Sequence, residues 1–413
     1  MISMDEIKER VILVAVDTDG SDQAERSLDE LGELAKTAGA EVVGRMIQPR
    51  ENIHPGTYIG KGKILELKEL LWETHGTGII CDDELTSVQM GNLEAELDCK
   101  IMDRTLLILD IFAARAVSGE GKIQVELAQL KYRASRLAGL GKSLSRLGGG
   151  IGTRGPGEKK LEMDRRLIKD RIAWLNRQLK EVVQNRDTMR KQRSRNHTPT
   201  VAIVGYTNAG KSTLLNALTD AGILSEDKLF ATLDPTTRGL ELENGQKILF
   251  TDTVGFISKL PHPLIRAFRS TLEEAKYADM ILHVVDVSNE HYERQMEVVY
   301  NTLRELEIGD KKVLTAFNKI DRMEAGDQTV YKDPRSDKTV YISAREKSGL
   351  DELLEKTEEI LNEGMIYLEK VFPYEEAGKI QLIRSHGQLL KEEYRDDGIY
   401  VEAYIPKEIL GSI

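Results

Sequence analysis

Hydrophobic and polar positions along the first quarter of the chain follow a pattern that predicts strands separated by helices. Short apolar runs such as Val11–Val16 have the length and β-branched content of buried strands. Longer stretches between them place apolar residues three and four positions apart, as one face of a helix requires. Strands alternating with helices predict a parallel sheet covered on its faces. The expected strands are Val11–Val16, Glu41–Ile47, Gly78–Cys81 and Lys100–Asp103, and the expected helices are Asp22–Ala38, Leu65–His75 and Ser87–Leu97.

From Ile123 onward the period changes to that of long amphipathic helices. Apolar residues recur from Ile123 to Leu137, and a second stripe runs from Leu161 to Val182, interrupted once by Arg165. Two such helices bury their narrow stripes most simply against each other, as an antiparallel hairpin. The joining segment, Gly139–Gly157, is rich in glycine, and we expect it to be flexible and exposed. If the second helix extends to near Arg190, it is about 45 Å long.

The remaining chain predicts a larger α/β region and a small tail. Residues Lys191–Pro199 are polar and basic and suggest a linker, and a strand at Val201–Val204 follows. The tail predicts strands at Ile366–Val371 and Gly398–Ile405 with a helix near Gln381–Tyr394. We therefore expect an α/β fold class in four parts: an N-terminal α/β domain at 1–115, a basic helical hairpin at 116–197, a third domain at 198–364 and a C-terminal α+β domain at 365–413.

Composition narrows the class of protein. The chain has 413 residues, too many for one ordinary core, with hydrophobic and charged fractions of 40% and 31% that are typical of soluble domains. No apolar run is long enough to span a membrane, and the N-terminus is charged, so we expect a cytoplasmic protein. Cys81 and Cys99 suit reduced structural thiols, and the seven histidines lack metal-ligand spacing. We expect no transition metal.

Charge is distributed unevenly along the chain. The net charge is −11, but Lys122–Arg195 holds 20 Lys and Arg against 7 Asp and Glu, which leaves −24 on the rest. Clustered cations suit a nucleic-acid backbone. The alternative interpretation is a solvated basic helical surface.

A phosphate-binding loop follows the strand Val201–Val204. The sequence from Gly205 to Ser212 matches G-x-x-x-x-G-K-[ST], with a helical stretch, Thr213–Leu218, directly after it. In such a loop backbone N–H groups surround the phosphates, the lysine reaches the β- and γ-phosphates, and the hydroxyl ligates Mg²⁺. The candidate nucleotide-binding residues here are Gly205, Tyr206, Thr207, Asn208, Ala209, Gly210, Lys211, Ser212 and Thr213.

A second motif supplies a carboxylate and a γ-phosphate sensor. Asp252, Thr253, Val254 and Gly255 follow the expected strand Lys247–Thr251. We assign Asp252 to Mg²⁺ and Gly255 to the sensing of the γ-phosphate.

Between these motifs lies Leu233–Arg238, where a threonine can cap Mg²⁺ and order the loop in the triphosphate state. We choose Thr236, with Thr237 as the neighbouring alternative. The metal ligands would then be Ser212, Thr236 and Asp252. The groups nearest the reaction would be Lys211, Thr236 and Gly255.

The base is predicted to be guanine. Asn318, Lys319 and Asp321 form an N-K-x-D motif after the strand Val313–Phe317. The Asp321 carboxylate accepts from the two N–H groups of the guanine edge, the Asn318 amide meets the base from another side, and the Lys319 stem covers its face. Ser343 and Ala344, after the strand Thr339–Ile342, supply backbone N–H to the guanine oxygen.

These motifs together resemble the translation-factor-related GTPases, and more narrowly the HflX family of ribosome-associated GTPases. The narrower resemblance rests on the residues that run from Gly149 to Glu158 and from Glu162 to Arg166, on Thr57–Lys63, on Phe230–Thr236 and on Asp252–Phe256. It covers essentially the whole chain. It implies a Ras-like P-loop GTPase domain that binds GTP or GDP with Mg²⁺.

The same resemblance implies binding to the large ribosomal subunit, with the N-terminal parts reaching its rRNA, and splitting or rescue of stalled ribosomes under stress. We expect no DNA partner and a monomer. A rival hypothesis is a non-ribosomal signalling or scaffold GTPase whose hairpin docks a protein. A third, an RNA-remodelling ATPase at the N-terminal domain, has less support, because only the later domain carries a recognisable phosphate loop.

Three further positions bear on hydrolysis and on additional sites. Phe256 stands where many Ras-like switches place a water-orienting glutamine, so we expect slow unassisted hydrolysis and help from the ribosome. Asn208 matches the asparagine that coordinates K⁺ in some cation-dependent GTPases, although it is equally compatible with a tolerant loop residue. Gly60–Lys63 lacks the spacing of a phosphate loop and suggests a basic turn at RNA or a solvated turn.

Overall fold

The computed structural model describes residues 8–18, 20, 22–147, 156–195, 198–219, 229–230, 235–242, 245–260, 274–309, 311–323 and 331–413. The chain divides into two compact units. The first comprises Met1–Lys180 with Lys259–Ala267, and the second Glu181–Ser258 with Phe268–Ile413. No helix among the described residues is long and apolar enough to cross a membrane.

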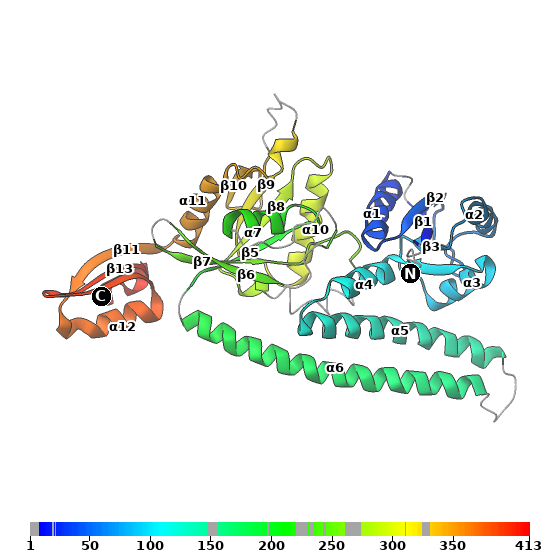
Figure 1. Ribbon diagram of the computed structural model, residues 1–413, viewed down its shortest axis with the longest axis horizontal. Helices are drawn as coiled ribbons and strands as arrows, with labels where there is room; N and C mark the ends of the chain where they lie inside the picture. Colours follow the sequence, from blue (N-terminus) through cyan, green and yellow to red (C-terminus); the bar gives the residue numbers. More distant parts are fainter. Residues whose placement is uncertain are drawn as a thin grey trace, which may run out of the picture. The chain divides into compact units, whose positions relative to one another are not determined.

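The first unit is built on a four-stranded parallel sheet in the order β2-β1-β3-β4 (Figure 1). On its central strand, Ile12 and Val14 face the cluster formed with α2 and α3, while Leu13 faces Gly32 of α1. Both faces are thus covered, which explains the near-continuous apolar runs. The strands are β1 (Arg10–Asp17), β2 (Glu41–Pro49), β3 (Gly78–Cys81) and β4 (Lys100–Asp103), and the helices α1 (Gln23–Thr37), α2 (Lys61–Glu73) and α3 (Ser87–Leu97).

A fourth helix, α4 (Arg104–Arg115), was not expected from the sequence. Its residues Leu107–Phe112 are apolar except for Asp110, and the apolar side chains there are almost all buried. A helix buried nearly all round shows no clear apolar stripe, so its period is hidden. The Asp103 carboxylate fixes its start by accepting from the backbone N–H of Leu106 at 2.9 Å.

Helices α5 (Gly119–Leu147) and α6 (Pro156–Arg195) form the expected pair of long helices. The prediction of a loop across Gly139–Gly157 is wrong for residues 139–147, which continue α5, and for residues 156–157, which begin α6. The prediction of a linker from Lys191 is wrong as far as Arg195, because α6 continues through it. Lys, Arg and Gln are good helix formers, so this segment is helical although it has no apolar stripe. The run from 148 to 155, where flexibility was expected, lies outside the described residues.

Polar contacts join the facing sides of α5 and α6. Arg171 makes a bidentate pair with Glu126 at 2.7 and 3.0 Å. Arg165, which interrupts the apolar stripe of α6, donates to the backbone oxygen of Leu137 at 2.8 Å. Arg165 therefore binds a backbone carbonyl of the neighbouring helix, and the two helices stay paired at this position.

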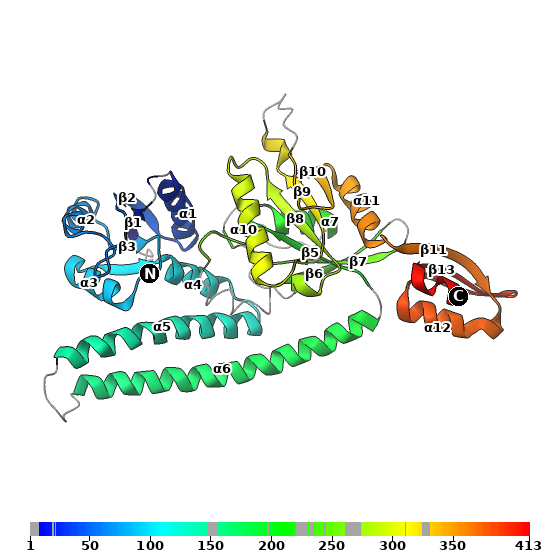
Figure 2. The same cartoon turned by 180° about the vertical axis from the view of Figure 1, so that it is seen from behind.

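The second unit is built on a six-stranded sheet in the order β10-β9-β8-β5-β7-β6, parallel except for β6. Helices α7 and α11 cover one face and α10 the other, as the view from behind shows (Figure 2). The strands are β5 (Thr200–Gly205), β6 (Thr236–Glu241), β7 (Lys247–Asp252), β8 (Met280–Asp286), β9 (Lys312–Asn318) and β10 (Lys338–Ile342), and the helices α7 (Lys211–Thr219), α10 (Tyr292–Glu305) and α11 (Leu350–Leu361).

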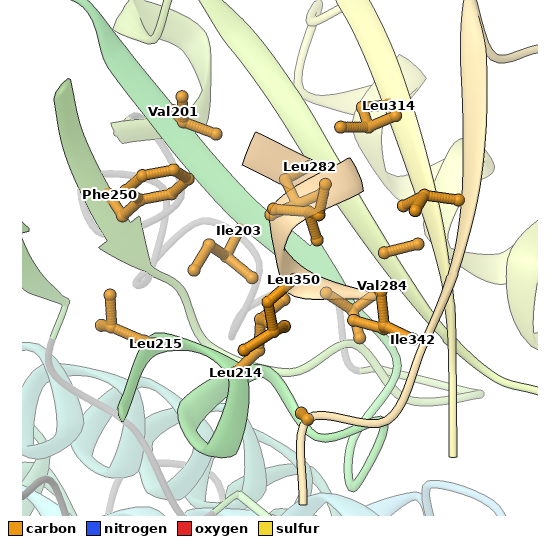
Figure 3. Packing of buried hydrophobic residues seen from close by; sticks show 14 of the residues in the cluster. Val201, Ile203, Leu214, Leu215, Phe250, Leu282, Val284, Leu314, Ile342 and Leu350 are labelled. Carbon is orange, nitrogen blue, oxygen red and sulfur yellow. The ribbon is translucent and has the colours of Figure 1, made fainter. Parts of the chain in front are cut away.

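The core of this sheet lies under α7 and α11. Leu214 and Leu215 of α7 meet Ile203 and Leu282 of the central strands, all fully buried (Figure 3). Because α7 begins directly after the loop that follows β5, its packing fixes where that loop ends. A single-turn helix, η1 (Ile320–Arg322), follows β9.

The C-terminal part of the second unit is a three-stranded antiparallel sheet in the order β11-β13-β12. The predicted helix Gln381–Tyr394 is wrong beyond His386, since the last seven residues of that span belong to a strand. The helix ends at Gly387, where a Cβ would lie 2.6 Å from the Tyr404 oxygen. The elements are β11 (Met365–Phe372), η2 (Tyr374–Glu376), α12 (Ala377–His386), β12 (Gln388–Arg395), β13 (Gly398–Pro406) and η3 (Lys407–Ser412).

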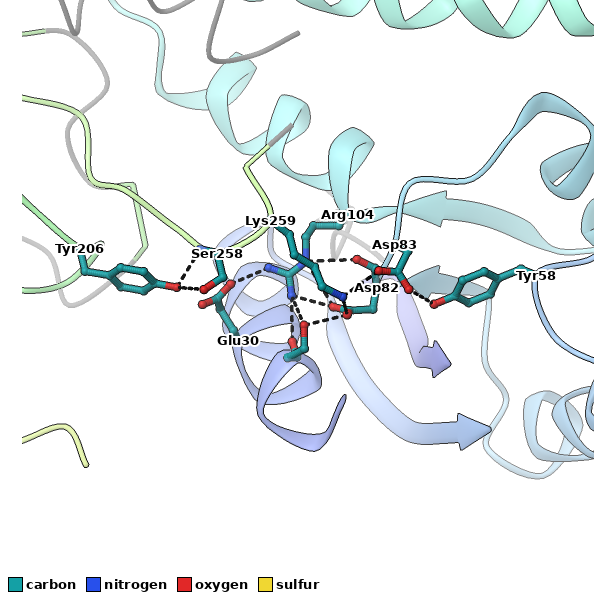
Figure 4. A network of polar contacts seen from close by, with 9 residues as sticks. Glu30, Tyr58, Asp82, Asp83, Arg104, Tyr206, Ser258 and Lys259 are labelled. Atoms are coloured by element: carbon teal, nitrogen blue, oxygen red, sulfur yellow. Dashed lines mark hydrogen bonds and ion pairs between the residues drawn. The ribbon is translucent and has the colours of Figure 1, made fainter. Parts of the chain in front are cut away.

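A buried ionic network organises the first unit (Figure 4). The Arg104 guanidinium, 2% exposed, lies 2.7 Å from Asp82 and 2.6 Å from Glu30. Lys259, which belongs to this unit, pairs with Asp82 and with Asp83. Burial alone would raise the pKa of Asp82, but Arg104 and Lys259 together lower it below its ordinary value. The network ties α1, the end of β3 and the start of α4 to one another.

We expect Arg104→Met to destabilise the protein by about 3–5 kcal/mol, because it leaves the buried Asp82 and the half-buried Glu30 without their main cation. Urea unfolding of the full chain, followed by circular dichroism, measures this loss. The matched control is Arg26→Met, which removes an exposed pair with Asp22 and should cost less than about 0.5 kcal/mol. Equal stability of the two variants would contradict the role given to the network.

Candidate functional site

The candidate site lies at the carboxyl ends of the parallel strands of the six-stranded sheet. The loops after β5, β7, β9 and β10 carry the motifs identified in the sequence. In open α/β sheets this edge is where loops and helix N-termini face a ligand. The topology therefore brings together segments of which the first and the last are more than 130 residues apart in the sequence.

The phosphate loop wraps around the Lys211 side chain. Its ammonium donates to the backbone oxygens of Gly205 and Tyr206 at 3.2 and 2.9 Å. Gly210 has φ +96°, and a Cβ there would lie 2.3 Å from the Asn318 amide nitrogen, so the second motif glycine is required by both conformation and space. The backbone is thereby held in the turn that leads into α7.

Oxygen ligands suitable for a hard cation converge beside this loop. The Ser212 hydroxyl donates to the buried Asp252 carboxylate at 2.7 Å. Thr236 lies directly opposite Asp252 in the antiparallel pair of β6 with β7. The alternative, Thr237, instead contacts the Thr251 hydroxyl at 2.9 Å. Leu233 and Asp234 of the predicted switch segment lie outside the described residues.

The second motif packs tightly against the phosphate loop. A Cβ on Gly255 would lie 2.9 Å from Thr207 Cα and 3.0 Å from Lys211 Nζ. The Thr253 hydroxyl donates to the Ile203 oxygen at 2.8 Å, and Val254 is buried. Phe256 donates its N–H to the Gly205 oxygen and accepts from the Thr207 N–H, at 3.1 and 2.8 Å. These contacts place Gly255 beside the phosphate loop.

The predicted base-recognition residues form one connected group. The Asn318 amide donates to the Ala209 oxygen at 2.9 Å and accepts from the Ala344 N–H at 3.0 Å. The Ser343 hydroxyl donates to Asp321 at 2.5 Å. Asn318 thus joins the phosphate loop to the Ser343–Ala344 turn, and the Ser343 hydroxyl orients the Asp321 carboxylate.

Two features of the site were not anticipated from the sequence. Lys319 has φ +67° and forms an ion pair with Asp286 at 2.7 Å. Asp286 ends β8, which lies next to β9 in the sheet. A carboxylate at the end of a neighbouring strand was the sequence feature from which this ion pair could have been predicted. The Tyr206 hydroxyl bonds to the N–H and hydroxyl of Ser258, each at 2.8 Å, and ties the phosphate loop to the segment after Gly255.

Asn208 stands apart from the other loop residues. It is exposed and has φ +61°, in the left-handed region that asparagine tolerates better than most residues. No group of three or more His, Cys, Asp or Glu side chains suited to a metal ion is found within the described parts of the chain.

Burial sets the charge balance at the phosphate loop. Burial lowers the pKa of Lys211, Asp252 opposes the shift and Lys319 adds to it, and the net result is a pKa of about 8. The ammonium remains mostly protonated at neutral pH. Because its pKa lies below the ordinary 10.5, the folded chain binds fewer protons than the unfolded chain between these values. The contribution of this lysine to stability therefore rises with pH across that window.

Comparison with known proteins identifies the family. Models described as "GTP-binding GTPase N-terminal", "GTP-binding GTPase Middle Region" and "50S ribosome-binding GTPase" match residues 25–113, 115–193 and 200–319. A "GTPase HflX" from Lacrimispora saccharolytica is 65% identical, with 100% of this chain and 97% of the relative covered. The chain belongs to the HflX family of GTPases. The resemblance stated from the motifs, the Ras-like α/β class and the GTPase activity are thereby confirmed.

Further relatives extend the likeness across bacteria. The GTPase HflX of Caldanaerobacter subterraneus is 51% identical over 97% of this chain and 92% of its own length. The GTPase HflX of Escherichia coli is 40% identical, with 83% of this chain and 80% of the relative covered. A solved GTP-binding protein from Sulfolobus solfataricus in complex with GDP is 24% identical, with 86% of this chain and 99% of that chain covered and a TM-score of 0.45. The match of residues 200–319 gives this HflX-family chain a 50S ribosome-binding GTPase domain.

We expect the affinity for GDP to fall as the pH rises past about 8, because Lys211 then loses its charge in the free protein. Bound phosphate restores the charge, so binding at pH 8.5–9 should take up close to one proton. Titration calorimetry in two buffers of different ionisation enthalpy measures that uptake. Lys211→Arg is the control, since a guanidinium stays charged and should show no uptake. Flat affinity of the parent from pH 7 to 9 would contradict the prediction.

Proposed function

We propose that this HflX-family GTPase is a GTP-controlled factor that binds the large ribosomal subunit through its rRNA and splits or rescues stalled ribosomes under stress. The observation that carries the proposal is a row of exposed cations on α6. It belongs to a segment with a local charge of +13 in a chain that is otherwise acidic. A phosphate backbone rewards such clustering.

The cations lie along one face of the helix. Arg166, Lys169, Arg177 and Lys180 are all exposed, and at 100° per residue their spacings of three, eight and three place them within one narrow stripe. Trp174 and Leu167 are exposed on the adjacent face. A basic stripe beside apolar and aromatic groups is a surface that suits structured RNA, where phosphates and stacked bases lie together.

The nucleotide site supports a division of roles. Lys211 reaches the β- and γ-phosphates, and backbone N–H groups of residues 205–213 surround them. The hydroxyls of Ser212 and Thr236 and the Asp252 carboxylate are hard oxygen donors at one place, which is what Mg²⁺ requires. Bound Mg²⁺ would neutralise charge between the β- and γ-phosphates.

Guanine recognition rests on Asp321. Its carboxylate, held by the Ser343 hydroxyl, accepts from the two N–H groups that adenine lacks. The Ala344 N–H and its neighbour serve the guanine oxygen, and the Lys319 stem covers the base. Asn318 acts chiefly by holding these loops together, because its amide already bonds at both ends.

The switch works through the segment that begins at Gly255. Its N–H senses the γ-phosphate, so GTP orders the segments around Thr236 and Gly255 and hydrolysis releases them. Phe256 offers no side-chain hydrogen bond to an attacking water, and its ring is 1% exposed. Unassisted hydrolysis is therefore slow, and the ribosome supplies or orders the missing element.

Four functional parts fit this mechanism: an N-terminal domain at 1–115 and a hairpin at 116–197 that contact RNA, a GTPase domain at 198–364, and a C-terminal domain at 365–413. The rival, a scaffold GTPase whose hairpin docks a protein, uses the same nucleotide site. The two differ in whether the α6 stripe binds phosphate.

We expect purified large ribosomal subunits to stimulate GTP turnover strongly. A variant with Arg166, Lys169, Arg177 and Lys180 all changed to Gln should lose most of the stimulation. In cosedimentation, the slope of log affinity against log salt should also become shallower, by roughly 0.7–0.9 for each lost phosphate contact.

The matched control changes four exposed lysines that lie elsewhere, Lys247, Lys312, Lys370 and Lys391, to Gln. It removes the same charge and should keep both stimulation and slope. No stimulation of the parent, or equal loss in both variants, would favour the scaffold hypothesis.

A role for K⁺ at Asn208 is a separate proposal. An exposed amide on the phosphate loop can bind K⁺ and add positive charge where the transition state becomes more negative. Single-turnover hydrolysis should then be about tenfold faster in K⁺ than in Na⁺ at equal ionic strength, and Asn208→Ala should abolish the difference. Equal rates of the parent in the two salts would exclude this role.

A further inference from the structure

An aspartate at the end of β8 binds the lysine of the base-recognition motif. The Asp286 Oδ2 atom lies 2.7 Å from the Lys319 Nζ atom, and the two side chains are only 14% and 13% exposed. The other carboxylate oxygen, Oδ1, accepts from the Ser288 N–H at 3.0 Å and from the Ser288 hydroxyl at 2.6 Å. Both oxygens of Asp286 are therefore in use, and Ser288 fixes the carboxylate that Lys319 binds.

The strand pairing and the backbone of Lys319 explain why these two side chains meet. Asp286 lies beside Asn318 in the parallel pairing of β8 with β9, and the Val287 N–H donates to the Asn318 oxygen at 3.1 Å. Lys319 follows with φ +67°, in the left-handed region that costs a lysine free energy. A strained backbone and a fixed carboxylate together restrict the lysine side chain to few rotamers.

The pair is not needed to join the two strands, which already pair along their length. It also differs from an ordinary surface pair of the same sheet. Lys312, at the start of β9, lies 3.0 Å from Asp337, but its side chain is 49% exposed. Exposed pairs of that kind contribute little to stability. What the Asp286 carboxylate changes most directly is therefore the position of the Lys319 side chain.

We propose that Asp286 is a positioning residue for guanine, which keeps the aliphatic stem of Lys319 against the face of the base by binding its ammonium group. This rests on the role proposed above for the Lys319 stem. A lysine that is free to rotate loses rotamer freedom when it packs against a ligand, and that loss weakens binding. Asp286 restricts the side chain before the base arrives, so less freedom is lost on binding. The stem covers the base in the same way whether two or three phosphates follow.

The test uses the full-length protein with Mg²⁺ and two ligands, GDP and a non-hydrolysable GTP analogue. Asp286→Asn keeps the shape of the side chain and removes the charge that holds Lys319. It should weaken the binding of both ligands by the same factor, about five- to tenfold. Single-turnover hydrolysis at saturating GTP should stay within about twofold of the parent, because the stem lies at the base and not at the reacting phosphate.

A second substitution tests whether Asp286 acts through the lysine. Lys319→Met keeps an aliphatic stem and lacks the ammonium group, so it should weaken both ligands to a similar extent. In the Lys319→Met background, Asp286→Asn should then cause less than about a twofold further loss. A carboxylate that only stabilised its own loop would weaken binding equally in both backgrounds.

The matched control is Asp337→Asn, which breaks the pair with Lys312 at the opposite end of β9. Its affinities for GDP and for the analogue should stay within about twofold of those of the parent. An equal loss in Asp337→Asn and Asp286→Asn would assign the effect to the sheet as a whole and overturn the proposal.

Three further results would also overturn it. The first is an unchanged affinity of Asp286→Asn for both ligands. The second is a larger loss for the analogue than for GDP, which would assign the effect to the repulsion between Lys319 and Lys211, by which Lys319 lowers the pKa of Lys211. The third is additive losses in the double variant. A parent that binds ADP as tightly as GDP would instead overturn the guanine site itself, and with it this role of Asp286.

Discussion

The amide of Asn318 holds together the loops on which the nucleotide site depends. It is 2% exposed, and it bonds to the Ala209 oxygen of the phosphate loop and to the Ala344 N–H of the turn after β10. Gly210 allows this approach, because a side chain there would occupy the space of the amide nitrogen. One buried side chain thus couples the phosphate end of the site to the base end, and replacing it would leave two backbone groups unsatisfied.

The parallel sheet makes that coupling geometrically available. Strands β5, β8 and β9 lie side by side and run in one direction, so their carboxyl ends present the phosphate loop, Asp286 and the base-recognition loop at the same edge. Strand β7 adds the Asp252 segment on the other side of β5. The hydrophobic core beneath, formed with α7 and α11, fixes the strands and leaves the chemistry to the loops.

The electrostatics of the molecule separate by segment. Buried charges in the first unit are paired, as with Arg104 and its carboxylates, and act as structural ties. Four exposed cations of α6 lie on one stripe, while the chain outside Lys122–Arg195 is acidic overall. At the phosphate loop, burial lowers the pKa of Lys211, but the side chain stays charged at neutral pH. This remaining positive charge favours a dianionic ligand. Charge therefore serves packing and nucleotide binding in different places, and RNA contact is what we propose for the stripe on α6.

Hydrophobic periodicity and motif spacing were enough to predict the α/β class, the helical pair and the residues gathered at the sheet edge, because phosphate and guanine chemistry restricts which residues can stand at which spacing. Tertiary packing decided the rest. Helix α4 is buried nearly all round, which hides its period, and β12 forms beside β13 where local preference favoured a helix. The ion pair of Lys319 with Asp286 and the hydrogen bond from the Thr207 N–H to the Phe256 oxygen join residues 33 and 49 positions apart. Such contacts exist only once the sheet has brought the strand ends together, so no local pattern records them.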